Sequence, residues 1–273
     1  MKTNSRLIAT MALATFASLS MAQVGRYYAT QGTSGPGTTF VYQAGAQVGS
    51  FAWAADAQMP IVVGDFGSGN RIRQAAGQPQ TGQPQQGDEY LLDGTPTGTT
   101  NFWNSGDPAG TTAYDGAYNG SNIFMVHWLG ATNGQVWRYD NNYGNGQFLF
   151  QANGGDIGIT YDSSTNTIWT GNFGTGLVQQ WDFNGNALAS FTAIGSSASA
   201  LAYDSQSDSF WLCNGVYGAG SLLNYDRNGN LLGSFVTGNY LLGGEFLAVP
   251  EPGTVVAFGV GALALLIRRR RAR

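Results

Sequence analysis

Short stretches in which apolar and polar residues alternate run through the middle of the chain. Ile157, Ile159 and Tyr161 are separated by a glycine and a threonine, which is the period of a β-strand. Turn sequences follow such stretches, for example "DSSTN" and "DFNGN" with Asn-Gly at its centre. No helical spacing of apolar residues is sustained between residues 23 and 250. The pattern therefore predicts an all-β domain without a long helix.

The same order of strands and turns recurs along the chain. Asp162 and Trp169 have counterparts 42 residues later, at Asp204 and Trp211. In the clearest copy the pattern predicts four strands, at 157–161, 167–171, 177–182 and 187–191. Repeats of about 40–45 residues with four short strands each are typical of β-propeller blades.

A third copy of the repeat precedes these two and covers residues 113–150. Its opening pair is Tyr114-Asp115, its third strand holds Trp137 to Asp140, and its fourth holds Phe148 to Phe150. An aspartate at a strand end can accept hydrogen bonds from the amides of the following turn. The recurrence of the Tyr-Asp pair favours that structural role over catalysis, since a catalytic residue is needed once.

Two fragments at the ends of the domain complete each other. Residues 26–51 resemble the later part of a unit, with Tyr42 in the place of Trp181, and lack an opening strand. Residues 243–249 resemble an opening strand with nothing after it. Together they predict one blade built from both ends of the chain, which hides edge strands that would invite aggregation. Six blades or an open array are the alternatives.

The expected blades are the composite one, 52–112, 113–155, 156–197 and 198–240. The second is the least regular. Its segment 75–87, "AAGQPQTGQPQQG", is rich in Gln, Pro and Gly and is expected to be a solvated loop. A strand is expected at "DEYLLDG" after it.

The chain begins with the pattern of a secretory signal peptide, residues 1–22. Lys2 and Arg6 precede an apolar stretch, and small residues, ending in Ala22, follow it. A buried N-terminal helix is the alternative. The sequence thus divides into a signal peptide, a propeller-like domain at 23–248 and a C-terminal segment at 249–273.

Charge is sparse and one-sided in the exported part. Between residues 23 and 250 there are five arginines, no lysine and 15 acidic residues, a net charge of −10. Nucleic-acid binding depends on Lys and Arg at phosphates, so no nucleic-acid partner is expected. The lone cysteine, Cys213, lies in an apolar run and is expected to be buried.

The C-terminal segment combines an apolar run with a basic end. Residues 253–267 carry no charge, and as a helix they would span about 22 Å, short of the ~30 Å hydrocarbon core. The aliphatic part of an arginine side chain can lie in the bilayer while its guanidinium reaches the water interface, and this allows a short helix to serve as a transmembrane segment. The arginines that would stop transfer on the cytoplasmic side are Arg268, Arg269, Arg270, Arg271 and Arg273.

Upstream of that run stand Val249, Pro250, Glu251 and Pro252. A Pro-Glu-Pro motif, an apolar helix and terminal arginines, in that order, resemble the PEP-CTERM sorting signal of Gram-negative bacteria. The same segment is also named the ice-binding protein C-terminal domain, a name that carries no evidence of ice binding. The resemblance covers about the last 25 residues.

The resemblance implies export, transient retention in the inner membrane and recognition by an exosortase. The mature protein is then expected at the cell surface or outside the cell. Proteins with this signal are often linked to exopolysaccharide and biofilm. A plain C-terminal membrane anchor is the alternative.

Two turns have the donor spacing of a calcium loop. The residues with suitably spaced oxygens are Asp182, Asn184, Asn186, Asp226, Asn228 and Asn230. A hairpin turn needs the same residue types, and no glutamate follows at the EF-hand distance. The pattern favours turns, and no metal or other cofactor is expected.

Few residues are candidates for catalysis. Asp88-Glu89 and Asp107 are acids outside the repeat, and paired carboxylates at one cleft would be needed for glycoside hydrolysis. The only histidine, His127, is expected to be buried or hydrogen-bonded on a strand. Tyr, Trp and Asn are abundant and suit both carbohydrate stacking and blade packing.

Two functions therefore remain. The favoured one is a non-catalytic binding or scaffold propeller of the envelope or extracellular matrix, with polysaccharide as the expected ligand. The alternative is a secreted propeller enzyme, a lyase or hydrolase of glycans. An enzyme should gather non-repeated acids and arginines at one mouth of the ring, with Asp65, Arg71 and Arg73 as the residues to look at.

Overall fold

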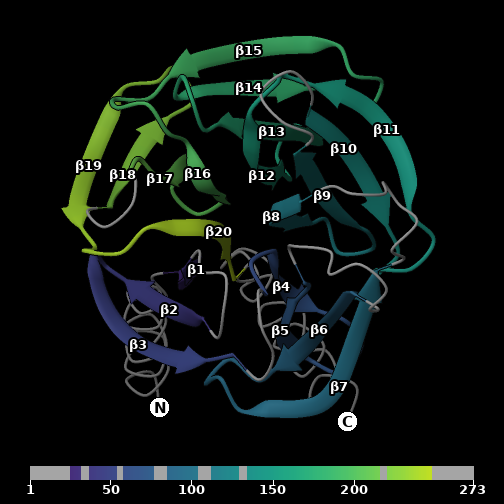
Figure 1. Ribbon diagram of the computed structural model, residues 1–273. Helices are drawn as coiled ribbons and strands as arrows, with labels where there is room; N and C mark the ends of the chain where they lie inside the picture. Colours follow the sequence, from purple (N-terminus) through teal and green to yellow (C-terminus); the bar gives the residue numbers. More distant parts are fainter. Residues whose placement is uncertain are drawn as a thin grey trace, which may run out of the picture. The chain divides into compact units, whose positions relative to one another are not determined.

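The computed structural model describes residues 25–31, 37–53, 58–76, 85–103, 112–128, 134–215 and 220–247. These residues form twenty strands in five antiparallel sheets of four, arranged around a ring (Figure 1). Apart from Gly25, they all belong to one compact unit, Arg26–Ala248. The predicted signal peptide and the predicted C-terminal transmembrane helix at 253–267 lie outside the described residues.

Each sheet is one blade, and its strands run in order from the inner strand outward. Blade 1 is β20 (Leu241–Phe246), β1 (Tyr27–Gln31), β2 (Thr38–Gln43) and β3 (Ala46–Ala52). Blade 2 is β4 (Ile61–Asp65), β5 (Asn70–Gln74), β6 (Gln85–Tyr90) and β7 (Pro96–Trp103). Blade 3 is β8 (Thr112–Tyr118), β9 (Ile123–Trp128), β10 (Gly134–Tyr139) and β11 (Gln147–Ala152).

Blade 4 is β12 (Asp156–Asp162), β13 (Thr167–Asn172), β14 (Leu177–Trp181) and β15 (Ala187–Thr192). Blade 5 is β16 (Ser199–Asp204), β17 (Ser209–Cys213), β18 (Ser221–Asp226) and β19 (Leu231–Val236). The sequence pattern predicted the four strands of blade 4 to within one residue at each end. The five-bladed all-β prediction is confirmed for the described residues.

The two ends of the domain share one sheet, as predicted. β20, the last strand, pairs antiparallel with β1, the first, with Tyr27 opposite Phe246 and Tyr28 opposite Glu245. The expected equivalence of Tyr42 and Trp181 also holds, because Tyr42 is opposite Tyr27 as Trp181 is opposite Ile168. Blade 1 is therefore closed by strands from both ends of the domain.

The irregular blade departs from its prediction. β6 begins at Gln85, inside the segment expected to be a loop, and it ends at Tyr90 rather than continuing through "LLDG". Ala75 and Ala76, expected in solvent, are buried. β7, which the pattern did not predict, completes the sheet. Residues 77–84 lie outside the described part of the chain.

The opening pair assigned to the third copy is also wrong. Tyr118 is opposite Ile123 in blade 3, just as Tyr161 is opposite Ile168 in blade 4. Tyr118-Asn119 is therefore the structural counterpart of Tyr161-Asp162, and the Asn119 side chain accepts bonds from its own turn. Asp115 lies in the middle of β8 and caps no turn.

Instead, Asp115 lies where the inner strands converge. It is fully buried, and its two carboxylate oxygens accept backbone N–H bonds from Gly116 at 2.9 Å, Gly244 at 2.8 Å, Leu201 at 3.0 Å and Ile159 at 3.1 Å. These donors belong to β8, β20, β16 and β12. One side chain thus ties together the inner strands of four blades.

Neighbouring blades pack through aromatic residues on the outer strands. Phe191 of β15 packs against Tyr225 on β18 of the next blade, with the ring centroids 5.3 Å apart and the ring planes tilted by 34°. The turn glycine that follows, Gly229, lies so close that an added Cβ would be 2.5 Å from the Cβ of Phe191. Gly185 meets Phe150 at the same distance across the preceding boundary.

Among the described residues there is no helix of a length and apolarity that could cross a membrane.

Candidate functional site

β-Bulges re-aim side chains where the inner strands begin. The ladder of β8 with β9 shifts between Ala113 and Gly116, and that of β12 with β13 shifts between Asp156 and Gly158. The bulged residues include Tyr114 and Ile157. Bulges of this kind turn side chains out of their regular alternation. In this ring the two bulges place Tyr114 and Ile157 in the same apolar cluster.

That cluster forms one end of the ring, which we call the aromatic end. Its members are Trp53, Met59, Tyr114, Ile157, Phe173, Tyr240 and Leu242, with Trp128 against Tyr114. The rings of Tyr114 and Trp128 are 6.2 Å apart, and those of Phe173 and Tyr240 are 6.4 Å apart, both edge to face. Trp128 is 36% exposed, and Tyr114 and Phe173 are partly exposed. Aromatic surface from blades 3 and 4 is therefore open to solvent at this end.

A buried carboxylate lies beside the cluster. Asp156 accepts hydrogen bonds from the Thr170 hydroxyl at 2.7 Å and from the Asn172 amide at 2.9 Å. Burial raises the pKa of Asp156 to about 6. The oxygen of Asn172 in turn accepts bonds from the backbone N–H groups of Gly174 and Thr175. This network fixes the backbone that carries Phe173.

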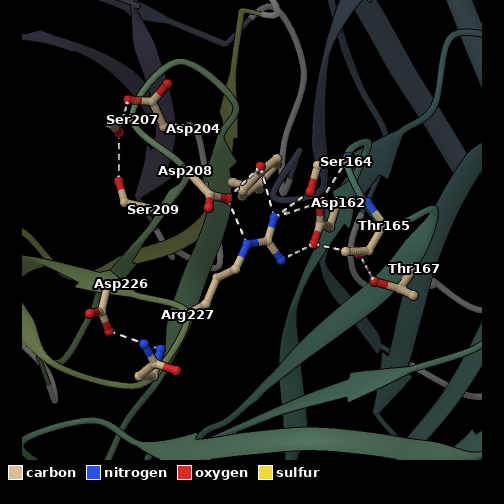
Figure 2. A network of polar contacts seen from close by, with 12 residues as sticks. Asp162, Ser164, Thr165, Thr167, Asp204, Ser207, Asp208, Ser209, Asp226 and Arg227 are labelled. Atoms are coloured by element: carbon tan, nitrogen blue, oxygen red, sulfur yellow. Dashed lines mark hydrogen bonds and ion pairs between the residues drawn. The ribbon is translucent and has the colours of Figure 1, made fainter.

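The opposite end, where the inner strands finish, is held by an arginine (Figure 2). We call it the hairpin end. Arg227, in the turn between β18 and β19, reaches across to Asp162 at the end of β12 and contacts both of its carboxylate oxygens. Arg227 also donates to Asp208 at 2.6 Å and lies over the Tyr203 ring, 5.1 Å from its centroid. The guanidinium therefore joins blade 5 to blade 4.

Asp162 is charged because its partners compensate its burial. Burial alone raises its pKa, but hydrogen bonds from Arg227, Thr165 and Ser164 outweigh it and hold the pKa well below its usual range. The hydroxyl of Thr165 donates at 2.7 Å, and the backbone and hydroxyl of Ser164 donate at 2.9 and 2.8 Å. The expected turn-capping role of Asp162 and Asp204 is confirmed, since Asp204 accepts from Gln206 and Ser207.

Two arginines of blade 2, Arg71 and Arg73, lie beside the same glutamate, and Arg73 also contacts blade 3. Arg73 donates to Glu89 at 2.8 Å, and Arg71 lies 4.0 Å from the same carboxylate. Arg73 is buried, stacks over Phe66 at 4.2 Å and donates to backbone and side-chain oxygens of the blade 3 turn, including Asn142 at 3.0 Å. Arg71, Arg73 and Glu89 are thus together, and the contacts of Arg73 join neighbouring blades.

The other candidate acids of blade 2 have separate partners. The Asp65 carboxylate accepts from the backbone N–H groups of Gly67 and Gly69. Asp88 is buried and accepts from the Gln58 amide at 2.5 Å. Asp107 lies outside the described residues. The bonds of Asp65 and Asp88 therefore tie them to groups other than the arginine pair.

The two calcium-like turns are closed by their own hydrogen bonds. One Asp182 oxygen accepts the backbone N–H groups of Asn184 and Asn186, and the other accepts the Asn186 amide at 2.7 Å. Asp226 makes the same three bonds with Asn228 and Asn230. A calcium ion would have to replace these bonds. Within the described ranges no three His, Cys, Asp or Glu side chains are grouped as a metal site.

The histidine and the cysteine lie where the sequence predicts. His127 is fully buried on β9, 2.8 Å from the hydroxyl of Tyr139, and burial lowers its pKa to about 3. It is neutral at physiological pH. Cys213 is buried, and burial raises the pKa of its thiol.

Sequence reasoning did not find the aromatic end. Its residues come from separate strands and loops, and their convergence depends on ring closure and on the bulges. Only the abundance of Trp and Tyr pointed toward it. The sorting-signal residues, Val249–Pro252 and the terminal arginines, lie outside the described residues.

The fold of the described residues is that of a five-bladed β-propeller. Among solved structures it is similar to a chain of a nidogen/laminin complex (10% identity, TM-score 0.51, covering 82% of this chain and 98% of that one). It is also similar to a protein of unknown function from Bacteroides caccae (10%, 0.51, 83% and 100%) and to TolB from Acinetobacter baumannii (10%, 0.50, 81% and 66%). Identities this low support the fold alone.

Residues 248–271 match the PEP-CTERM protein-sorting motif. The match confirms the resemblance read from Val249 to Arg273. This motif implies export and membrane-anchored, exosortase-mediated sorting in Gram-negative bacteria. A search of curated proteins found no match to this chain.

Proposed function

We propose that the protein is an exosortase-sorted, non-catalytic propeller that binds polysaccharide at its aromatic end, at the cell surface or in the extracellular matrix. The observation that carries the proposal is the solvent-accessible aromatic surface of Tyr114, Trp128 and Phe173 at one end of the ring. The sorting motif supports delivery to a compartment where such a ligand is present.

The chemistry of the aromatic end suits a neutral sugar. The C–H face of a pyranose ring is apolar and slightly electropositive, and it packs on the negative face of an aromatic ring. The acid beside the cluster, Asp156, is buried, and its oxygens accept hydrogen bonds from Thr170 and Asn172 within the protein. Aromatic platforms with a few polar groups at their edge are typical of small-molecule sites.

The non-catalytic part of the proposal is supported by the contacts of the ionic residues. Glycoside hydrolysis needs two carboxyl groups facing one cleft. Asp162 and Glu89 are held in ion pairs with Arg227 and Arg73. Asp115 is enclosed by backbone N–H donors. Each of these carboxylates therefore stabilises the fold through its own contacts.

The alternative is a glycan-degrading enzyme that uses the blade 2 cluster. It is favoured by one observation, the proximity of Arg71, Arg73 and Glu89 outside the repeat. Against it, the side chains of Arg73 and Glu89 are 7% and 6% exposed, which leaves little surface for a substrate.

A glycan array with the purified full-length chain tests the proposal. We expect binding to at least one neutral polysaccharide, and we expect Trp128→Ala to weaken it by roughly tenfold or more, the usual effect of losing a central aromatic contact. Phe148→Ala is the matched control, because Phe148 is a half-exposed aromatic on the outer strand β11.

Absence of binding to any glycan would contradict the polysaccharide ligand. Equal loss with Phe148→Ala would contradict the aromatic end as its site. Release of new sugar ends during incubation, abolished by Glu89→Gln, would show the enzyme instead.

A further inference from the structure

The outer strand of each blade has one free edge. Within the described residues, β3, β7, β11, β15 and β19 stand last in their sheets and pair with one neighbour only, and they run around the outside of the ring (Figure 1). None of these strands contains Asp, Glu, Lys or Arg. Soluble proteins protect such edges with charge because free backbone N–H and C=O groups can pair with another chain.

β19 is the most apolar of these edges. Its sequence is "LLGSFV", and Leu231, Leu232 and Val236 are 44%, 58% and 80% exposed. Ser234, between the last two, is exposed as well. From Gly233 to Val236 the strand pairs regularly with β18, after a register shift beside Leu232. From Gly233 to Val236 the segment is therefore a regular, uncharged strand edge, and the aliphatic side chains of Leu232 and Val236 are exposed on either side of Ser234.

We propose that β19 pairs antiparallel with β19 of a second copy of this chain, with Ser234 opposite itself on the two-fold axis. This register places Leu232 of one copy opposite Val236 of the other, and it does so twice by symmetry. Two exposed aliphatic pairs then flank a serine pair, and such cross-strand pairs are the units that stabilise a sheet. The interface is isologous, the common form in homodimers.

The charge distribution favours this occupant. Residues 23–250 carry a net charge of −10, so two copies repel each other over most of their surface. In the antiparallel pair, Gly229 and Asn230 at the end of the turn of one copy lie opposite Asn239 and Gly238 of the other, and all four residues are uncharged. The edge of β19 is thus a place where two copies meet without opposing like charges.

The equivalent edge of blade 4 serves as an internal comparison. Ser190 of β15 corresponds to Ser234, since Phe191 and Phe235 occupy the same place in their strands. An antiparallel pair centred on Ser190 would place Leu188 opposite Thr192, which loses the aliphatic contact. The proposed register therefore distinguishes β19 from β15.

Cysteine cross-linking of the full-length chain in detergent tests it. Ser234→Cys places two thiols opposite each other, at a Cα separation of roughly 4.5–5.5 Å that a disulfide spans. Ser190→Cys and Gln206→Cys are the controls, the second on an exposed turn. The native Cys213 is buried and does not compete. We expect the Ser234→Cys chain to form at least about fivefold more disulfide-linked dimer than either control.

Leu232→Lys in the Ser234→Cys background should reduce the dimer at least about threefold, because two lysines then face the apolar edge. Unchanged urea midpoints identify the variants as folded. Cross-linking of Ser234→Cys no greater than that of Gln206→Cys would overturn the proposal. Equal cross-linking of Ser190→Cys, or no effect of the lysine, would overturn the β19 register. The test needs no glycan, so it stands apart from the binding proposal.

Discussion

At the scale of single residues, a few polar side chains carry much of the architecture. Asp115 and Arg227 both reach beyond their own blades, one at the axis and one at the hairpin end. Burial raises the pKa of Asp115 well above that of an exposed aspartate, and the four N–H donors oppose the shift. Each of the two Asp115 oxygens accepts two of these N–H bonds, so all four lone-pair positions accept a hydrogen bond, as expected for a carboxylate.

Replacing Asp115 should be among the most damaging single changes in the chain. Asp115→Ala leaves four buried N–H groups without an acceptor, at about 1–3 kcal/mol each, which approaches the whole stability of a typical domain. Asp115→Asn should be intermediate, because its amide NH₂ faces two donors. Urea unfolding followed by tryptophan fluorescence measures both. Asp93→Asn, on an exposed turn, is the control, and an Asp115→Asn chain as stable as this control would refute the assignment.

Removing Arg227 should change the acid response of the protein. The folded pKa of Asp162 is depressed, so its contribution to stability is present above the unfolded pKa of about 3.9 and is lost as the pH falls below it. In Arg227→Met the buried carboxylate loses its cation, and we expect a loss of about 3–5 kcal/mol at pH 7. Below about pH 4 the difference from the parent should shrink. Urea midpoints between pH 2 and 7 measure this.

Arg138→Met is the matched control, because Arg138 bonds to Gln147 on the outer strand of its own blade. Its effect should stay within about 0.5 kcal/mol at every pH. An Arg227→Met effect that does not vary with pH would mean that the charge of Asp162 is not what the arginine stabilises.

At the scale of elements, the turn glycines Gly185 and Gly229 lie against a phenylalanine of the preceding blade. Gly229 has a φ of +80° and lies against Phe191, whereas Gly45 has a φ of +77° in the turn between the two outer strands of blade 1 and meets no atom within 4 Å of an added Cβ. The two residues share a positive φ and differ in their neighbours. They therefore separate the cost of backbone strain from the cost of a clash.

Alanine at each glycine should show this difference. Both variants carry the cost of a left-handed non-glycine residue, about 1 kcal/mol. Gly229→Ala must in addition displace Phe191, and overpacking adds roughly 1–3 kcal/mol. Differential scanning calorimetry should give a lower Tm for Gly229→Ala than for Gly45→Ala. Equal Tm values would show that the blade boundary adjusts freely.

The regular elements were predictable and the irregular ones were not. Blades 4 and 5 follow from alternation and Asn-Gly turns, which are local properties of the chain. β7 of blade 2 carries threonine and asparagine where other outer strands carry aliphatic residues, so no hydrophobic period marks it. The bulge at Tyr114 depends on where neighbouring inner strands pack, and the position of Asp115 follows from it. The Tyr114-Asp115 pair therefore resembled a turn cap in the sequence, whereas in the structure Asp115 lies among the inner strands of the ring.

At the scale of the whole domain, the ring has two chemically different ends. The aromatic end presents Tyr114, Trp128 and Phe173, whereas the hairpin end is closed by the ion pairs of Arg227. Closure of blade 1 by β1 and β20 was predicted from two incomplete repeats: residues 26–51 lack an opening strand, and residues 243–249 form an opening strand alone. The sorting motif at 248–271 follows directly after this closing strand in the sequence. The functional account depends on the aromatic end being the face that meets the ligand.

Hydrogen exchange measured by mass spectrometry, with and without a neutral polysaccharide that the glycan array shows to bind, tests that claim most directly. We expect slower exchange in peptides that cover 112–118, 123–128 and 172–175, which carry the partly exposed aromatic residues. Exchange in the turns 163–166, 205–208 and 227–230 of the hairpin end should not change. Slowing confined to those turns, or no slowing anywhere, would contradict the account.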